Sequence, residues 1–157
     1  MQHAGETIGL VSWPLPNVWL GVSAERQQEA EKRVPALLRT PAAIRFVSAE
    51  PLIGPIKFWN MDEGVLRGCG VIEDGGVTPS SPDNPPEGYD SSYPGIDWVI
   101  VGGESGPGYR PMDPAWAADI REQCAGAGVA FFMKQMAGKT AIPAELMHRE
   151  FPQQSLK

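Results

Sequence analysis

The tetrapeptide Val-Ser-Ala-Glu occurs twice in this chain, at residues 22–25 and again at residues 47–50. Both copies end a short apolar run, WLGVSAE in the first case and RFVSAEPL in the second. Such runs are almost continuously apolar rather than alternating, which is typical of strands covered on both faces of a parallel sheet. The repeat therefore indicates two strands of one sheet that end in the same way.

Four runs of this kind predict four strands. We expect them at residues 18–23, 43–48, 97–102 and 129–134. Residues 27–38 have the composition of a helix, in which Pro35 should cause a kink or an early end. A second helix should begin after Asp113, which can cap the free amides, and should stop at Gly126 or Gly128. Strands and helices in this order predict an α/β fold of four parallel βα units.

The remaining segments have no clear hydrophobic period. We expect a single domain, residues 1–157, with a long insertion at about residues 57–95. The insertion can be a surface linker or a lid, and residues 64–72 within it suggest a small hairpin. Residues 135–157 are expected to form a polar tail with a short helix at residues 143–148.

Composition limits the class of protein. The net charge of −6 argues against sequence-independent nucleic-acid binding, because that activity needs a basic surface. The two cysteines, Cys69 and Cys124, cannot alone form a disulfide framework, a zinc site or an iron–sulfur site. The sequence shows no signal peptide and no apolar run long enough to span a membrane. We therefore expect a soluble, cytoplasmic protein.

Each expected strand is followed by small polar, charged or glycine residues. The carboxyl ends of parallel strands meet at one edge of the sheet, where ligands bind in α/β folds. This edge, called the rim below, comprises Ser23, Glu25, Ser48, Glu50, Gly102, Gly103, Glu104, Ser105, Lys134 and Gln135. Three glutamates at one rim repel one another unless a cation, a ligand amine or Lys134 lies among them. Alternatively, the glutamates cap helices or pair with the arginines Arg26, Arg45 and Arg110.

The glycine-rich stretch GGESGPG at residues 102–108 does not fit the dinucleotide-binding motif G-x-G-x-x-G. It is similar to a hydrolase nucleophile elbow around Ser105, but Pro107 stands where the elbow has its second glycine. His148 is the histidine that could pair with Ser105. A small hydrolase using Ser105 is therefore one alternative function, and a metal-dependent carboxylate enzyme is another.

The segments PLPNVWLGVSAE, TPAAIRFVSAEPLIGPI and IDWVIVGGESGPGYRPMDPAW resemble a phage and prophage family of radical-SAM-like proteins of unknown function. The resemblance runs from about residue 14 to residue 152. It implies the second half of a TIM-like (β/α) barrel, with Glu25, Glu50, Glu104 and Lys134 at the ligand-facing mouth. In full-length members, the first half is expected to carry three cysteines that ligate a [4Fe–4S] cluster cleaving S-adenosylmethionine.

This chain lacks the three-cysteine cluster of the family. The resemblance therefore implies a ligand-binding C-terminal half that holds no cofactor of its own and is catalytically silent alone. Its expected partner is a second copy or a polypeptide that supplies the other half of the barrel. The alternative is a non-catalytic protein-interaction module derived from a phage protein. Neither a membrane nor a nucleic acid is indicated as a partner.

Overall fold

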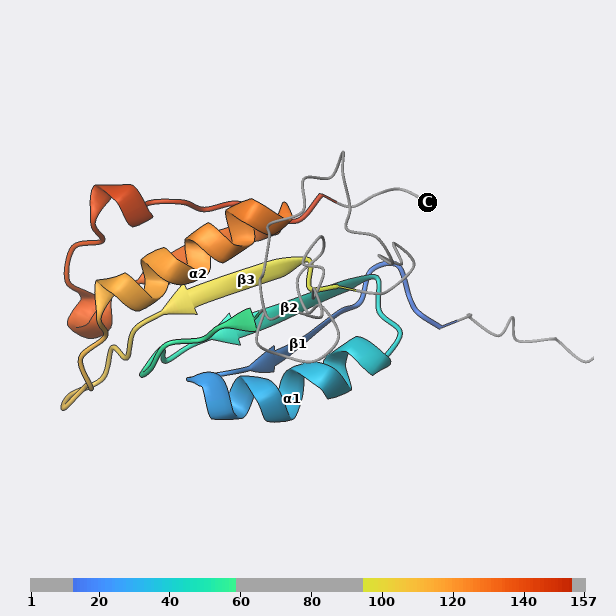
Figure 1. Cartoon of the computed structure of the whole chain (residues 1–157), viewed down its shortest axis with the longest axis horizontal. Coiled ribbons are helices and arrows are strands. Elements are labelled where there is room, and N and C mark those ends of the chain that lie inside the picture. The colour runs from blue at the N-terminus through green and yellow to red at the C-terminus, as the bar shows by residue number, and fades with distance from the viewer. Residues whose placement is uncertain (1–12, 59–94, 154–157) are drawn as a thin grey trace, which may run out of the picture.

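The computed structural model describes residues 13–58 and 95–153 (Figure 1). Four strands and two α-helices form an α/β domain in these residues. They are β1 Trp19–Ser23, α1 Gln27–Arg39, β2 Ile44–Ala49, β3 Trp98–Gly102, α2 Pro114–Ala127 and β4 Ala130–Gln135. The hairpin expected at residues 64–72 and most of the insertion at residues 57–95 lie outside the described residues.

The sheet has the order β1-β2-β3-β4, and all three neighbouring pairs are parallel. The two Val-Ser-Ala-Glu copies lie side by side in register, with Val22 opposite Val47 and Ser23 opposite Ser48. The Ala24 N–H donates to the Ser48 carbonyl at 2.9 Å, so the pairing continues into the repeat. The parallel α/β architecture expected from the sequence is confirmed, and the repeat marks the point where two adjacent strands leave the sheet.

Local sequence explains both helices. Asp113 accepts a hydrogen bond from the Ala115 N–H at 2.9 Å and so caps α2, while Gly128, with φ of 63°, ends it. α1 agrees with the helix expected at residues 27–38 to within one residue, and Pro35 does not shorten it, because the helix continues to Arg39. Its apolar stripe extends beyond the proline to Leu38, and burial of that stripe offsets the lost backbone hydrogen bond.

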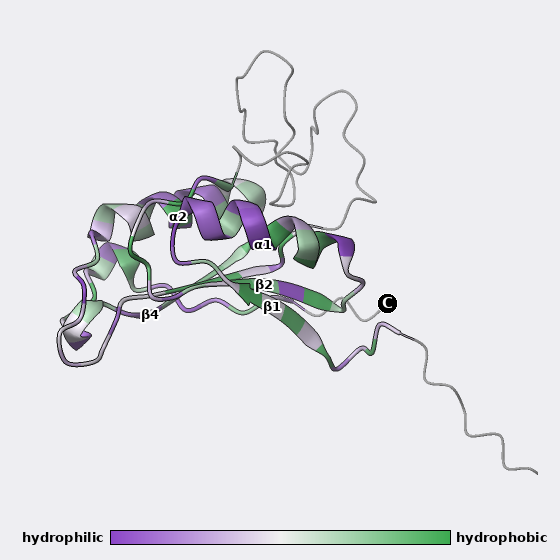
Figure 2. Ribbon diagram, turned by 90° about the horizontal axis from the view of Figure 1, so that it is seen from below, coloured by the Kyte–Doolittle hydropathy of each residue, from purple (hydrophilic) through white to green (hydrophobic). Residues whose placement is uncertain are grey.

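Both helices cover the same face of the sheet (Figure 2). Their buried side chains share one core with Val47, Val99, Val101, Phe131 and Met133, which alternate along the strands. Right-handed connections from β1 to β2 and from β3 to β4 place α1 and α2 on one face of a parallel sheet, and this explains the arrangement. The core layer therefore lies entirely between the sheet and the helices.

The opposite face of the sheet carries no helix among the described residues, and we call it the helix-free face. Trp98 lies at its centre, with ring centroids 5.9 Å from Trp19, 6.0 Å from Phe46 and 5.9 Å from Phe132. The Phe46 ring lies across Gly21, where a Cβ atom would come within 2.3 Å of it. The half of this face nearest the amino-terminal ends of the strands is thus an aromatic surface that spans all four strands.

Residues 136–153, within the segment expected to form a polar tail, fold back against α2 and the edge of β4. Leu146 is buried, in a 3₁₀ helix at Ala144–Leu146 that stands where a short helix was expected. Beyond it, the Met133 N–H donates to the His148 carbonyl at 2.8 Å, and the Glu150 N–H donates to the Phe131 carbonyl at 2.9 Å. Residues 148–150, called the edge cover below, therefore close the outer edge of β4.

Candidate functional site

The centre of the rim is an ion pair between Glu50, which follows β2, and Lys134 of β4. The Lys134 Nζ lies 2.8 Å and 2.9 Å from the two Glu50 carboxylate oxygens. The pair crosses β3 directly above Gly102, where a Cβ atom would stand 3.0 Å from the Glu50 Cδ. The Glu50 side chain is 21% exposed and that of Lys134 is 52% exposed, so the pair is accessible from solvent.

Glu104, which the sequence places on the same rim, binds Arg110 within its own loop. Its Oε2 accepts from the Arg110 backbone N–H at 2.7 Å and from Nε at 3.1 Å, while Oε1 accepts from Nη2 at 2.9 Å. These hydrogen bonds lower the pKa of Glu104 to about 2. Arg110 is one of the three arginines expected as alternative partners of the rim glutamates. Because Glu104 and Arg110 are six residues apart, their hydrogen bonds close a turn of the loop that follows β3.

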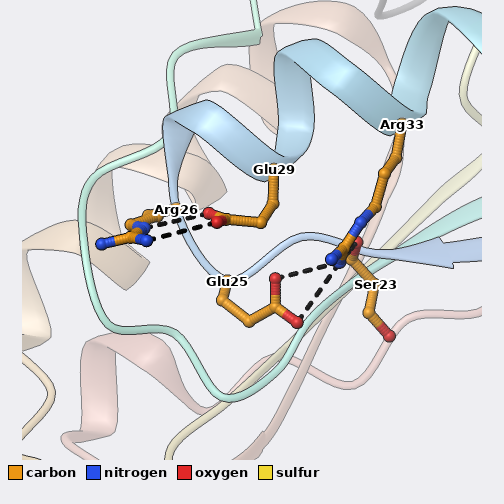
Figure 3. A network of polar contacts seen from close by, with 5 residues as sticks. All are labelled: Ser23, Glu25, Arg26, Glu29 and Arg33. Carbon is orange, nitrogen blue, oxygen red and sulfur yellow. Dashed lines mark hydrogen bonds and ion pairs between the residues drawn. The ribbon is translucent and has the colours of Figure 1, made fainter.

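Glu25 binds Arg33 of α1, as Figure 3 shows. The Arg33 Nη1 lies 3.0 Å from Glu25 Oε2 and donates to the Ser23 carbonyl at 2.7 Å. Arg26, an expected partner of these glutamates, instead binds Glu29 at 3.0 Å. No motif in the sequence marks Arg33, which reaches Glu25 because α1 runs back along β1.

The three rim glutamates are therefore each neutralised by one base. Glu25 pairs with Arg33, Glu50 with Lys134 and Glu104 with Arg110. Glu25 also contributes to the raised pKa of Arg110, although less than Glu104 does, so acids and bases alternate along this part of the rim. The repulsion expected among three carboxylates is removed by the chain itself, without an added cation.

The glycines of the rim allow close packing inside the protein. A Cβ atom on Gly103 would come within 2.2 Å of the Ala137 backbone nitrogen, in the loop after β4. Hydrogen bonds join the same two loops, because Gln135 Nε2 donates to the Gly103 carbonyl at 2.8 Å and the Gly138 N–H donates to the Glu104 carbonyl at 2.8 Å. We call this unit the paired loops. They bring Gly103, Glu104 and Gln135 together.

The rim serines differ in their positions. Ser23 and Ser48 are register neighbours, and within the described residues neither hydroxyl makes a hydrogen bond. Ser105 is exposed in the loop after β3, whereas His148 lies beside Met133, and its ring faces Arg121 at 3.5 Å. No hydrogen bond joins Ser105 to His148 in the described part of the chain.

Within residues 13–58 and 95–153, no group of three or more His, Cys, Asp and Glu side chains is placed to hold a metal ion. In the same ranges, no helix is both long and apolar enough to cross a membrane. The chain thus has the architecture of a parallel α/β protein with polar side chains at the carboxyl ends of its strands.

Residues 1–153 match a family described as "Protein of unknown function (DUF5131)", and the chain belongs to this family. No curated protein and no solved structure matches the chain.

Proposed function

We propose that this chain is the ligand-binding C-terminal half of a (β/α) barrel related to radical-SAM-like phage proteins, working in the cytoplasm and catalytically silent alone. The observation that carries the proposal is the Glu50–Lys134 ion pair, which spans three strands at their carboxyl ends. That end of the strands is the ligand-binding end in parallel α/β folds, so the position of the pair supports a binding role.

The topology supports the half-barrel part of the proposal. In a closed (β/α) barrel, strands follow one another in sequence order, helices cover the outer face and side chains fill the interior. The order β1-β2-β3-β4, the helices on one face and the aromatic helix-free face have the same arrangement over four strands. Open doubly wound sheets instead place helices on both faces.

An iron–sulfur cluster does not fit the residues of this chain. Cys124 is fully buried within α2, away from the rim, and Cys69 is the other cysteine of the sequence. Two thiols cannot supply the three ligands that the family resemblance implies for its cluster. We therefore assign no step of radical chemistry to these residues.

The electrostatics of the rim suggest which ligands it accepts. Each rim glutamate already has a basic partner, so an ionic ligand gains little Coulomb energy unless it displaces one of them. A polar ligand with both donors and acceptors can instead bind the solvent-facing sides of Glu50 and Lys134 and the hydroxyls of Ser23 and Ser48, which make no hydrogen bond to other described residues. Neutral polyols, nucleosides and amino acids meet this description.

Nuclear magnetic resonance titration tests the binding role. The isotopically labelled chain is titrated with glucose, uridine and glycine as probes, and shifts are expected at Ser48, Glu50, Gly102 and Lys134. The double substitution Glu50→Gln with Lys134→Met should abolish them, whereas Glu145→Gln, at an exposed position after β4, should not. Shifts that survive the double substitution, or no shift with any probe, would contradict the proposal.

Anaerobic reconstitution with iron and sulfide tests the proposal that this chain alone holds no iron–sulfur cluster and is catalytically silent. We expect no stoichiometric iron after desalting, because this chain offers fewer than three cysteine ligands. A chain that retains iron, and loses it when Cys69 and Cys124 are both changed to serine, would show that radical chemistry belongs to this half as well.

A further inference from the structure

The two edges of the sheet are treated differently by the chain. The outer edge of β4 is closed by the edge cover, which binds Phe131 and Met133 through backbone hydrogen bonds. The Phe131 N–H also donates to the Glu150 side chain at 3.0 Å. β1, at the other edge, has the sequence WLGVS, which contains no charged residue and no proline. Charges and prolines are the usual protection of strand edges against association.

The hydrogen bonds of β1 show which of its backbone groups point outward. The Ala24 N–H points toward β2, because it donates to the Ser48 carbonyl. Backbone groups alternate along a strand, so those of Trp19, Gly21 and Ser23 point away from β2. The Ser23 carbonyl agrees with this assignment, since it accepts from Arg33. In the described part of the chain, no other hydrogen bond reaches these outward groups.

We infer that β1 is a dimerisation edge, at which two copies of this chain pair their β1 strands antiparallel about a two-fold axis at Gly21. In that register, Gly21 faces Gly21 of the second copy and Trp19 faces Ser23. The two-fold axis repeats the Trp19–Ser23 pair, so there are three pairs with the central one. Each pair exchanges two hydrogen bonds, which gives about six in all. The Ser23 carbonyl can accept both Arg33 and the second strand, because it has two lone pairs.

A second copy fits this edge for two further reasons. Closure of two copies into a ring would require β1 to pair with β4, and the edge cover already occupies that edge. The antiparallel register also keeps like charges apart. Glu25 stands four residues from the axis, so the two Glu25 residues are about 27 Å apart at ~3.4 Å per residue. This separation is well beyond the screening length of about 8 Å at physiological salt.

The dimer does not depend on the proposed ligand-binding function, because it uses backbone groups of β1 and not the Glu50–Lys134 pair. It does compete with completion of a barrel, since both would use the β1 edge. Completion of a barrel would in addition require the edge cover to leave β4. The contact is small compared with the ~800 Å² that each partner buries in a standard interface, so the expected dissociation constant is on the order of 100 µM. The net charge of −6 on each copy should make the dimer tighter as salt is raised.

Sedimentation of the full chain from about 10 to 500 µM tests the inference. The wild-type chain should shift from monomer to dimer, and Ser23→Ala, which keeps the backbone N–H, should do the same. Ser23→Pro removes that N–H and should weaken the dimer at least about tenfold. Circular dichroism confirms that both variants are folded.

Hydrogen exchange supplies an independent readout at single residues. In the wild-type chain, the amides of Trp19 and Gly21 should exchange more slowly as concentration rises, while those of Leu20 and Val22 stay slow throughout. A monomer at every concentration would overturn the inference and leave the edge to a different polypeptide. A dimer that is as tight in Ser23→Pro, or that leaves the Gly21 amide unprotected, would also overturn it.

Discussion

At the scale of a single residue, Gly102 sets how closely the Glu50 carboxylate of the central ion pair can lie across β3. The Glu50 carboxylate lies across this glycine, and a methyl group there would approach the Glu50 Cδ to 3.0 Å. We expect Gly102→Ala to shift the carboxylate by a few tenths of an ångström, to weaken its ion pair with Lys134 and to lower the free energy of unfolding by under about 1 kcal/mol. Urea unfolding measures this loss.

Gly106→Ala is the matched control for this substitution. A Cβ atom at Gly106 meets no other atom within 4 Å, so the added methyl group has open space. We expect the control to leave stability unchanged or to raise it by under about 1 kcal/mol. Equal losses in the two variants would mean that the contact between Glu50 and Gly102 is not what restricts residue 102.

Glu104 should make stability sensitive to acid. Its pKa of about 2 in the folded protein lies below the ordinary value near 4.5, because Arg110 binds the charged carboxylate. The stabilisation is therefore complete above about pH 4.5 and is lost as the pH falls toward 2. Glu104→Gln should lower the free energy of unfolding at pH 6 more than at pH 3, as measured by urea unfolding at both.

The control for this prediction is Glu145→Gln, because Glu145 is exposed and is not among the acidic groups that raise the pKa of Arg110. Its difference from the wild-type chain should not shrink on acidification. A Glu104→Gln difference that stays constant from pH 6 to pH 3 would show that the Arg110 contact is not maintained in solution.

Sequence reasoning identified part of this site and missed the rest for a physical reason. Glu50 and Lys134 follow from strand ends alone, because parallel strands bring their carboxyl ends together. Arg110 could be named for Glu104 because the two are close in sequence. Arg33 could not be found, since its reach to Glu25 depends on how α1 is turned against β1, which no local pattern encodes.

At the scale of the element, α1 and α2 each contain a proline in a different setting. Pro35 is inside α1, where it lacks the N–H of the helical hydrogen bond, while Pro114 is the first residue of α2. We expect Pro35→Ala to stabilise the protein by about 1–3 kcal/mol and Pro114→Ala to destabilise it by under about 1 kcal/mol. Thermal unfolding of both variants should show shifts of opposite sign. A loss of stability in Pro35→Ala would mean that the proline ring has packing contacts that outweigh the missing hydrogen bond.

The elements that local sequence controls were predicted most accurately. All four strands lie within one residue of their expected bounds, because apolar runs and terminal small residues define them. The edge cover was not predicted, because residues 148–150 have no strand pattern of their own and pair with β4 only through the tertiary fold. α1 extends past Pro35 for a similar reason, since its stripe is held by the core.

At the scale of the whole molecule, the edge cover should limit how many copies can associate. A chain that ends at residue 147 lacks the backbone groups that close β4 and exposes Phe131 and Met133 at a free edge. With both edges open, β1 of one copy can pair with β4 of the next, which allows rings or open chains of copies. Sedimentation should show species larger than dimers for residues 1–147 and none for the full chain. Truncated protein that stays monomeric or dimeric would contradict a role of the edge cover in limiting association.

The parallel order of the sheet could be predicted from the sequence, but the asymmetry of its edges could not. Apolar runs predict strands and their direction follows from the intervening helices, whereas edge protection depends on where residues after Lys139 fold back. The apolar composition of β1 could suggest an unprotected edge. Its outward groups can be identified only from the hydrogen bonds of Ala24 and Arg33.

The paired loops have a consequence for motion. Gly103 and Ala137 touch through their backbones, and hydrogen bonds tie both strands' exits together, so neither loop can swing without the other. The β1 and β2 ends are tied in the same way, because the Ile53 N–H donates to the Glu25 carbonyl at 2.9 Å and the Leu52 N–H donates to the Gly102 carbonyl at 2.8 Å. Adaptation to ligands of different size would therefore come from the exposed side chains of Glu50 and Lys134, with the backbone of the four strand ends acting as a fixed reference against which the ligand is held.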